Sequence, residues 1–255
     1  MKKELKDYLY YSTNLGNLYL GDNKEILPLI NQKINLCLTS PPYNIGQLGA
    51  KRRDFFSGDK NKYKNKNKIY DFMNDDLLAE EYISQQRRLL MDIWELIESN
   101  GAIFYNHKHR ILNGMLDDRK NLITIPIRQE IVWNKSSMIN FNGNFFAPNT
   151  ERIYIMAKPK WKINKEYVGL GEVWTIRNCD KSKHPATFPL KLAELVIVSS
   201  TKENDIVLDP YIGSGTTALA CERLNRNWIG IEISEKYCKI AKKRISMEAD
   251  QLKIF

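Results

Sequence analysis

Cysteine and histidine are scarce in this chain of 255 residues, which has four of the first and three of the second. The cysteines stand far apart and form no CxxC pair, so the sequence argues against a zinc ribbon and provides no disulfide framework. We expect small, buried, reduced side chains at Cys37, Cys179, Cys221 and Cys238. His107 and His109 have no acidic or thiol partner nearby in sequence, and no metal site is predicted.

Long apolar runs are absent as well. No stretch approaches the roughly 20 apolar residues that a membrane-spanning helix requires. Met1-Lys2-Lys3 leads into a charged segment and not into an apolar one, so we expect no signal peptide, no membrane partner and a cytoplasmic protein. The sequence also shows no internal repeat.

The chain does contain many apolar residues (43%) and an excess of positive charge. Its length fits one large α/β domain over residues 1–255, with enough apolar material for a sizeable core. The net charge of +9 favours an anionic partner such as nucleic acid, although a generally basic protein would show the same balance.

Short apolar segments alternate with amphipathic ones along the chain. Strands are predicted at 18–20, 34–38, 102–105, 125–133, 151–157, 205–208 and 227–231, and helices at 24–30, 77–99, 188–200, 215–224 and from 234 onward. Asn100-Gly101 is expected to end the helix over 77–99. This alternation predicts an α/β fold, a single doubly wound and mostly parallel sheet with helices on both faces.

The segment at about 47–75 has a different composition. Lysines and arginines alternate there with asparagines and aromatic residues, and aliphatic residues are few. This composition predicts a mobile, basic surface loop. Its cations include Lys51, Arg52, Arg53, Lys62 and Lys64.

A strand, a tight turn and the start of a helix are predicted from Val207 to Thr217. Asp209 and Pro210 follow the strand, and the glycines of Gly213-Ser214-Gly215 let backbone amides approach a ligand closely. Glu232 ends the next strand, where a carboxylate can accept both hydroxyls of a ribose. The pattern predicts a site for a nucleoside cofactor.

Three cofactors compete for this site. Gly213-x-Gly215-x-x-Ala218 satisfies the dinucleotide fingerprint, which leaves a nicotinamide oxidoreductase open, whereas no lysine follows the glycines as in an ATPase phosphate loop. S-adenosylmethionine carries a sulfonium cation in place of a pyrophosphate, and a carboxylate such as Asp209 suits a cation better. The loop therefore favours the methyl donor, and a purely structural turn is the remaining alternative.

A second loop follows the predicted strand at 34–38. Ser40-Pro41-Pro42-Tyr43 has a rigid backbone and an exposed Pro41 carbonyl, because prolines fix φ and lack an N–H donor. The Ser40 hydroxyl and that carbonyl can both accept hydrogen bonds from one exocyclic amino group, which keeps the nitrogen lone pair available for attack on a methyl group. Tyr43 can stack on a flat base. An ordinary Pro-Pro turn with a core tyrosine is the alternative.

The two loops together resemble those of the amino-group DNA methyltransferases. Thr39 to Asn44 is similar to the catalytic loop of that family, and Asp209 to Thr217 is similar to its cofactor loop. The catalytic loop comes first, as in the permuted β group. The resemblance covers about residues 15–245 and implies a Rossmann-like fold, S-adenosylmethionine as cofactor and double-stranded DNA as substrate. It gives Ser40, Pro41, Pro42 and Tyr43 as the catalytic residues.

Further site residues follow from the same resemblance. The segment before the cofactor loop looks like the one that holds the methionine end of the cofactor, and Asp22 lies where the family contacts its adenine. The implied cofactor set is Asp22, Lys183, His184, Pro185, Thr187, Asp209, Pro210, Gly213, Ser214, Gly215, Thr216, Thr217 and Glu232. Two segments, which contain Trp133 and Lys135 and Glu151, look like those around the base pocket. We add Trp133 and Lys135 to the loop cations as predicted DNA contacts.

The first residue of the catalytic tetrapeptide bears on the target base. In this family, adenine-N6 enzymes mostly carry Asp there and cytosine-N4 enzymes mostly carry Ser, so Ser40 favours cytosine N4, with adenine N6 as the alternative. The long recognition region of many β-group members is reduced here to about residues 158–178. The basic loop at 47–75 is then the better candidate for DNA contact, unless it is only a solvated surface.

The resemblance also implies a role in restriction–modification with a companion restriction endonuclease, and it allows a homodimer. An RNA methyltransferase and a catalytically silent DNA-binding module are the rival functions.

Overall fold

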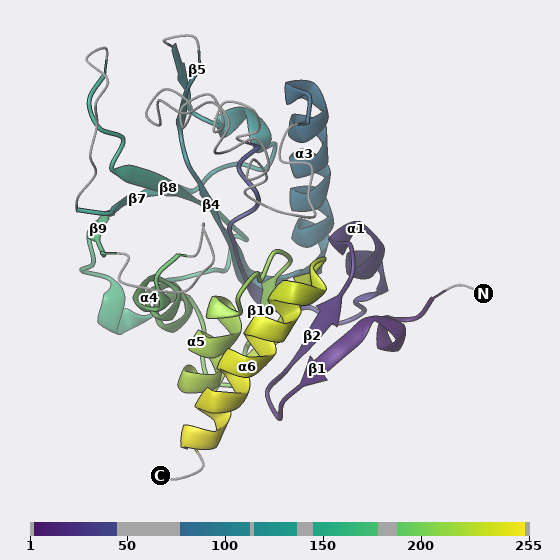
Figure 1. Cartoon of the computed structure of the whole chain (residues 1–255). Helices are drawn as coiled ribbons and strands as arrows, with labels where there is room; N and C mark the ends of the chain where they lie inside the picture. The colour runs from purple at the N-terminus through teal and green to yellow at the C-terminus, as the bar shows by residue number, and fades with distance from the viewer. Residues whose placement is uncertain (1–2, 45–76, 113–114, 137–144, 178–187, 253–255) are drawn as a thin grey trace, which may run out of the picture.

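The computed structural model describes residues 3–44, 77–112, 115–136, 145–177 and 188–252, and these ranges form a nine-stranded sheet between layers of helices (Figure 1). Five neighbouring strands are parallel, and β1 on one side and β8 on the other run antiparallel to their neighbours in this group. In order across the sheet, the strands are β1 (Leu9–Ser12), β2 (Gly16–Leu20), β11 (Asn227–Glu232), β10 (Ile206–Asp209), β3 (Ile34–Thr39), β4 (Ile97–His107), β8 (Thr150–Ala157), β7 (Gln129–Asn134) and β9 (Val173–Thr175). The predicted α/β fold with a mostly parallel sheet is confirmed.

The helices cover both faces of the sheet, as Figure 1 shows. One face packs against α4 (Leu190–Ser200), α5 (Thr216–Leu224) and α6 (Glu235–Leu252). The other packs against α1 (Asn23–Ile26) and α3 (Ala79–Leu96). The described ranges also contain the short 3-10 helices η1 (Leu5–Tyr8), η2 (Leu27–Leu29), η3 (Lys120–Leu122) and η4 (Lys165–Tyr167).

Alternating side chains of the central strands supply the two cores. Leu36 and Leu38 of β3 point into the α4–α5–α6 core, whereas Cys37 between them lies in the α1–α3 core. Neighbouring strand residues face opposite sides of a sheet, so a strand that is apolar at every position must be buried on both faces. This is why a continuous apolar run, and not an alternating one, indicated these strands.

The prediction of a helix over 77–99 is wrong at the carboxyl end. α3 stops at Leu96, and Ile97 already has an extended backbone as the first residue of β4. Asn100-Gly101 therefore lies inside a strand. A Cβ at position 101 would come 2.6 Å from the carbonyl oxygen of Asn35, so this glycine permits a close approach of β3 and β4.

Other boundaries differ less. β7 begins at Gln129, not at Ile125, and Pro126 in the omitted part has no N–H for a strand ladder. Among the strands, β1, β9 and the hairpin of β5 (Arg110–Leu112) with β6 (Met115–Asp117) were not predicted. Cys37, Cys221 and Cys238 are buried and free as expected, while Cys179 lies outside the described residues. None of the helices within the described ranges is long and apolar enough to cross a membrane.

The parallel strands determine the edge of the sheet at which a ligand site is expected. β2, β11, β10, β3 and β4 run in one direction, so their carboxyl ends meet at one edge of the sheet. Chain order reverses between β10 and β3, since β10 leads to β11 on one side and β3 leads to β4 on the other. Open α/β sheets bind ligands at such a switch point.

Candidate active site

Both predicted loops leave the sheet at this switch point. β10 and β3 are hydrogen-bonded neighbours, with Leu208 opposite Cys37, so Asp209 and the catalytic tetrapeptide leave the same edge of the sheet. Adjacent strands lie about 4.8 Å apart. Residues that are about 170 positions apart in sequence are therefore brought side by side.

The catalytic loop is held by hydrogen bonds between its own side chains and the neighbouring strands. The Ser40 hydroxyl is partly exposed and lies 3.0 Å from the Tyr43 hydroxyl. Tyr43, which is 8% exposed, donates to Oε2 of Glu151 over 2.9 Å. Glu151 comes from the start of β8, and its other oxygen pairs with Nζ of Lys135 at 2.7 Å.

Asn106 connects these groups from the end of β4. Its Nδ2 lies 3.2 Å from Oγ of Ser40, 2.8 Å from the Tyr43 hydroxyl and 3.0 Å from Oε2 of Glu151. The side chain is 1% exposed. Asn106 was not among the predicted site residues. Its signal was its position directly after the predicted strand 102–105, at the edge where polar side chains of parallel strands meet.

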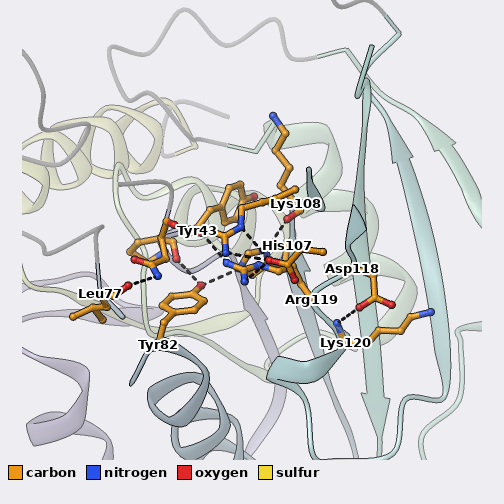
Figure 2. Close-up of polar contacts among 12 residues, drawn as sticks. Tyr43, Leu77, Tyr82, His107, Lys108, Asp118, Arg119 and Lys120 are labelled. Carbon is orange, nitrogen blue, oxygen red and sulfur yellow. Dashed lines mark hydrogen bonds and ion pairs between the residues drawn. The ribbon is translucent and has the colours of Figure 1, made fainter. Parts of the chain in front are cut away.

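The Tyr43 ring packs against a second group of polar side chains, shown in Figure 2. His107 lies against it with 4.7 Å between ring centroids. The Tyr82 hydroxyl bridges the Pro42 carbonyl oxygen at 2.7 Å and Nε2 of His107 at 2.9 Å, so α3 is tied to the loop. Burial, and then the charge of Arg119, hold the pKa of His107 well below its ordinary value, so this imidazole is neutral.

Two arginines fix the backbone that follows Tyr43. Arg119 donates to the Tyr43 carbonyl oxygen over 3.1 Å, and Arg110 donates to the carbonyl oxygen of Asn44. Asp117 accepts from both guanidinium groups. Asn44 has a φ of 53°, a left-handed conformation that needs outside support in a residue with a side chain. Arg110 begins β5 and Arg119 directly precedes η3, both after β4 in sequence, and no sequence pattern identified them.

The cofactor loop has the predicted turn geometry. Gly213 and Gly215 have φ of 54° and 85°, values that favour glycine. Asp209 is 2% exposed and accepts from the Thr217 hydroxyl at 2.6 Å and the Tyr211 amide at 3.1 Å. Burial raises the pKa of Asp209 to about 6, and the two hydrogen bonds oppose this rise.

Glu232 lies beside this loop at the end of β11. Its carboxylate accepts from the amides of Gly213 at 2.9 Å and Ser234 at 2.8 Å. Burial raises its pKa to about 7, and Asp209 adds to the rise. Two buried carboxylates so close together favour a cationic ligand. The donor set therefore fits S-adenosylmethionine, with Glu232 toward the ribose hydroxyls, better than it fits a pyrophosphate.

Asp22 lies at the same edge, after β2. It caps α1 by accepting from the Lys24 amide at 2.9 Å. Its neighbour Asn23 donates to the Pro210 carbonyl oxygen over 3.2 Å, which connects the α1 turn to the cofactor loop. The structure thus brings Asp22, Asp209 and Glu232 to one edge, as predicted.

Two residues predicted to contact DNA, Trp133 and Lys135, are engaged with other groups of the protein. Trp133 is 2% exposed, and its indole N–H donates to the Ile176 carbonyl oxygen over 2.8 Å, so its burial does not fit the prediction of DNA contact. Lys135 is likewise engaged with Glu151. Trp133 thus belongs to the core, whereas Lys135 is partly exposed and lies just after β7, beside the catalytic loop through Glu151.

The remaining predicted residues lie outside the described ranges. They are the DNA-binding candidates Lys51, Arg52, Arg53, Lys62 and Lys64 and the cofactor candidates Lys183, His184, Pro185 and Thr187. Among the described residues, a cavity of about 510 Å³ is lined by Arg177, Lys191 and Arg244, among others. Arg244 also donates to Ser214 Oγ over 2.8 Å, which connects the cavity wall to the cofactor loop.

Comparison with known proteins identifies the family of this chain. A family model described as DNA methylase matches residues 34–243, most of the chain and both loops. The type II methyltransferase M.HinfI of Haemophilus influenzae is 30% identical over 96% of this chain and 70% of its own length. M2.LlaDCHI of Lactococcus lactis subsp. cremoris is 30% identical over 94% of this chain and 93% of its own length.

Solved structures share the fold. The PvuII DNA methyltransferase, described as cytosine-N4-specific, superimposes with a TM-score of 0.72 at 20% identity and covers 96% of this chain and 94% of its own. A complex of M1.HpyAVI with S-adenosylmethionine gives a TM-score of 0.62 at 27% identity, over 90% of this chain and 100% of that one.

Proposed function

The chain belongs to the amino-group DNA methyltransferase family, and on that premise we propose that it methylates the exocyclic N4 amino group of cytosine in duplex DNA. Its cofactor is S-adenosylmethionine. The observation that carries the proposal is the position of Ser40 directly after β3, beside the start of the cofactor loop, since β3 and β10 are paired neighbours.

The chemistry requires an amino group with an available lone pair. An exocyclic amino group donates its lone pair into the ring, and acceptors on its N–H bonds counteract this. The Ser40 hydroxyl and the Pro41 carbonyl are the acceptors that the catalytic loop offers. When bound, S-adenosylmethionine would supply the methyl group, with the C–S electron pair remaining on sulfur as the N–C bond forms, and the proton lost by the amino nitrogen would pass to water. The protein acts by position, because the described part of the loop, residues 39–44, contains no nucleophile–base pair.

A serine at this position supports cytosine as the target. Ser40 is a neutral acceptor, whereas an aspartate would be charged and stronger. The similar fold of a protein described as cytosine-N4-specific agrees with this choice but does not decide it, because 20% identity indicates the fold alone. Adenine N6 is the alternative target, and mass analysis of the methylated nucleosides distinguishes the two.

The target base must leave the duplex before its amino group can reach Ser40. We propose that the base then stacks near Tyr43, at the edge where the two loops meet. The cations of the 47–75 loop are our candidates for phosphate contacts. As in the type II systems to which its relatives belong, the protein would protect DNA from a companion restriction endonuclease.

The variant Ser40→Ala tests the role of the loop. It removes one acceptor from the reacting amino group, so we expect turnover to fall on the order of 100-fold, in the range found for a single stabilising group in an active site. The affinity for S-adenosylmethionine, measured by calorimetry, should stay within about twofold because Ser40 lies outside the glycine loop. Ser246→Ala on α6 is the matched control and should behave as wild type. Full activity of Ser40→Ala would remove Ser40 from the mechanism.

A further inference from the structure

A serine differs from an aspartate in one respect that matters for an acceptor: its oxygen carries a proton. If that proton points at the substrate, Ser40 offers a donor where the reaction needs a lone pair. Some feature of the site must therefore turn the Ser40 proton away from the amino group. The direction of the surrounding hydrogen bonds identifies this feature.

Glu151 fixes the direction of the chain of hydroxyls. An ionised carboxylate only accepts, so Tyr43 gives its single hydroxyl proton to Glu151 over 2.9 Å. The Tyr43 oxygen is then an acceptor for Ser40, 3.0 Å away. The Ser40 proton thus points inward, toward Tyr43, and the Ser40 lone pairs are left for other donors.

Asn106 enforces the same direction. Its Nδ2 faces Oε2 of Glu151 at 3.0 Å, and this contact requires the nitrogen, not the oxygen, of the amide on that side. The same nitrogen lies 3.2 Å from Ser40 and 2.8 Å from Tyr43. With one amide proton on Glu151, the other lies against the two hydroxyl oxygens, and this favours the arrangement in which each hydroxyl donates onward, from Ser40 to Tyr43 and from Tyr43 to Glu151.

Lys135 is the cationic partner of Glu151. The ion pair is 2.7 Å long, and the side chains of Lys135 and Glu151 are 16% and 9% exposed. One carboxylate oxygen of Glu151 is thus occupied by the cation and the other accepts from Tyr43. A group that could also donate at this position, such as the amide of a glutamine, would leave the direction of the chain undetermined.

We propose that Glu151 is a positioning residue for methyl transfer, which acts through Tyr43 to present a lone pair of Ser40 to the amino group of the target base. The proposal rests on the proposed function. Through two hydroxyl groups, Glu151 provides the negative charge that an aspartate at position 40 would bring directly to the substrate.

The first test compares Glu151→Gln with Glu130→Gln. A glutamine keeps the size of the side chain but can donate to Tyr43 and no longer pairs with Lys135 as an anion. We expect kcat to fall about 10- to 100-fold, the range for outer partners that orient a reacting group. Glu130, on neighbouring β7, pairs with Arg152 and Lys120 outside this chain of hydroxyls, so Glu130→Gln should keep kcat within about threefold.

A second test separates positioning from a merely structural role. In Ser40→Asp the acceptor is charged and has no proton to orient, so adding Glu151→Gln should cost less than about threefold in kcat. A structural role would make the two losses multiply, which would overturn the proposal. If Ser40→Asp has no measurable turnover, Tyr43→Phe serves as the background variant instead. Tyr43→Phe already breaks the hydrogen bonds between Ser40 and Glu151, so adding Glu151→Gln should lower kcat little further.

A third test needs no methyl transfer. Duplexes with cytosine or with 2-pyrimidinone, which lacks the amino group, at the target position are bound in the presence of S-adenosylhomocysteine. The ratio of the cytosine affinity to the 2-pyrimidinone affinity should be roughly 5- to 10-fold lower in Glu151→Gln than in the wild type, as one hydrogen bond implies, because the easier unpairing of 2-pyrimidinone is the same for both proteins. An unchanged preference would refute the role of Glu151. A wild type that transfers no methyl group to DNA would instead refute the proposed function itself.

Discussion

Replacing Glu232 with glutamine should remove the contribution of this residue to the pH dependence of the protein's stability. Burial raises the pKa of this carboxyl from 4.5 to about 7. A carboxyl whose folded-state pKa is raised stabilises the protein fully below the unfolded pKa, and this contribution is lost as the pH rises through the folded pKa. The wild type should therefore become less stable between about pH 5 and pH 8.

The size of the effect follows from the shift. A difference of about 2.5 pKa units corresponds to about 3 kcal/mol, of which about 2.5 kcal/mol falls between pH 5 and pH 8. Asp209 adds a change of the same sign over a lower pH range, because its pKa is raised from 3.8 to about 6. Glu232→Gln has no proton to lose at this position, so only the Asp209 part of the slope should remain.

Urea unfolding of the cofactor-free protein at pH 5, 6, 7 and 8 measures this slope. The control is Glu235→Gln, whose side chain is 60% exposed and pairs with Lys239 on the surface of α6, and it should keep the wild-type slope. Glu232→Gln should also bind S-adenosylmethionine weakly at every pH, since an amide is a poorer acceptor for ribose hydroxyls. Parallel pH profiles for Glu232→Gln and the wild type would show that Glu232 is not buried as a high-pKa group.

Two further variants test the support of the catalytic loop and the binding of DNA. Arg119→Met leaves the Tyr43 carbonyl without this donor and Asp117 with only one of its two arginines, so the free energy of unfolding should fall by about 2 kcal/mol, whereas Arg223→Met, in a half-exposed ion pair, should cost less than about 1 kcal/mol. Equal effects of the two substitutions would contradict the role of Arg119. Deletion of residues 58–68 should weaken duplex binding and lower the slope of log K against log salt by about 0.9 for each phosphate that these residues neutralise, while the exposed Lys162→Gln should change little. Unchanged DNA binding after the deletion would exclude these residues as contacts to DNA.

The central fold was predictable because the strands that build it are buried on both faces. Ile34–Thr39 and Ile206–Asp209 are apolar almost throughout and end in loops with Pro and Gly, which indicates both the strand and its end. The end of α3 was not predictable in the same way. The apolar stripe of the helix continues into β4 through Ile97, and Asn100-Gly101 has the composition of a helix stop although it serves a close approach of two strands.

The candidate site was predictable where its residues are contiguous. Ser40-Pro41-Pro42-Tyr43 and the Asp209 loop each carry their pattern within a few residues. The groups that orient them come from distant elements, with Asn106 on β4 and Glu151 on β8. Their roles depend on pairing across the sheet, which no local pattern encodes. Trp133 illustrates the converse, because a tryptophan near a base-pocket segment is equally suited to the core, where the structure has it.

The most direct test of the central claim is methylation of mixed-sequence duplexes with isotopically labelled S-adenosylmethionine, followed by mass analysis of the nucleosides. We predict label in N4-methylcytosine. Label in N6-methyladenine would keep the family but contradict the assignment that rests on Ser40, and an absence of labelled nucleosides from active, cofactor-binding protein would contradict amino-group methylation of DNA altogether.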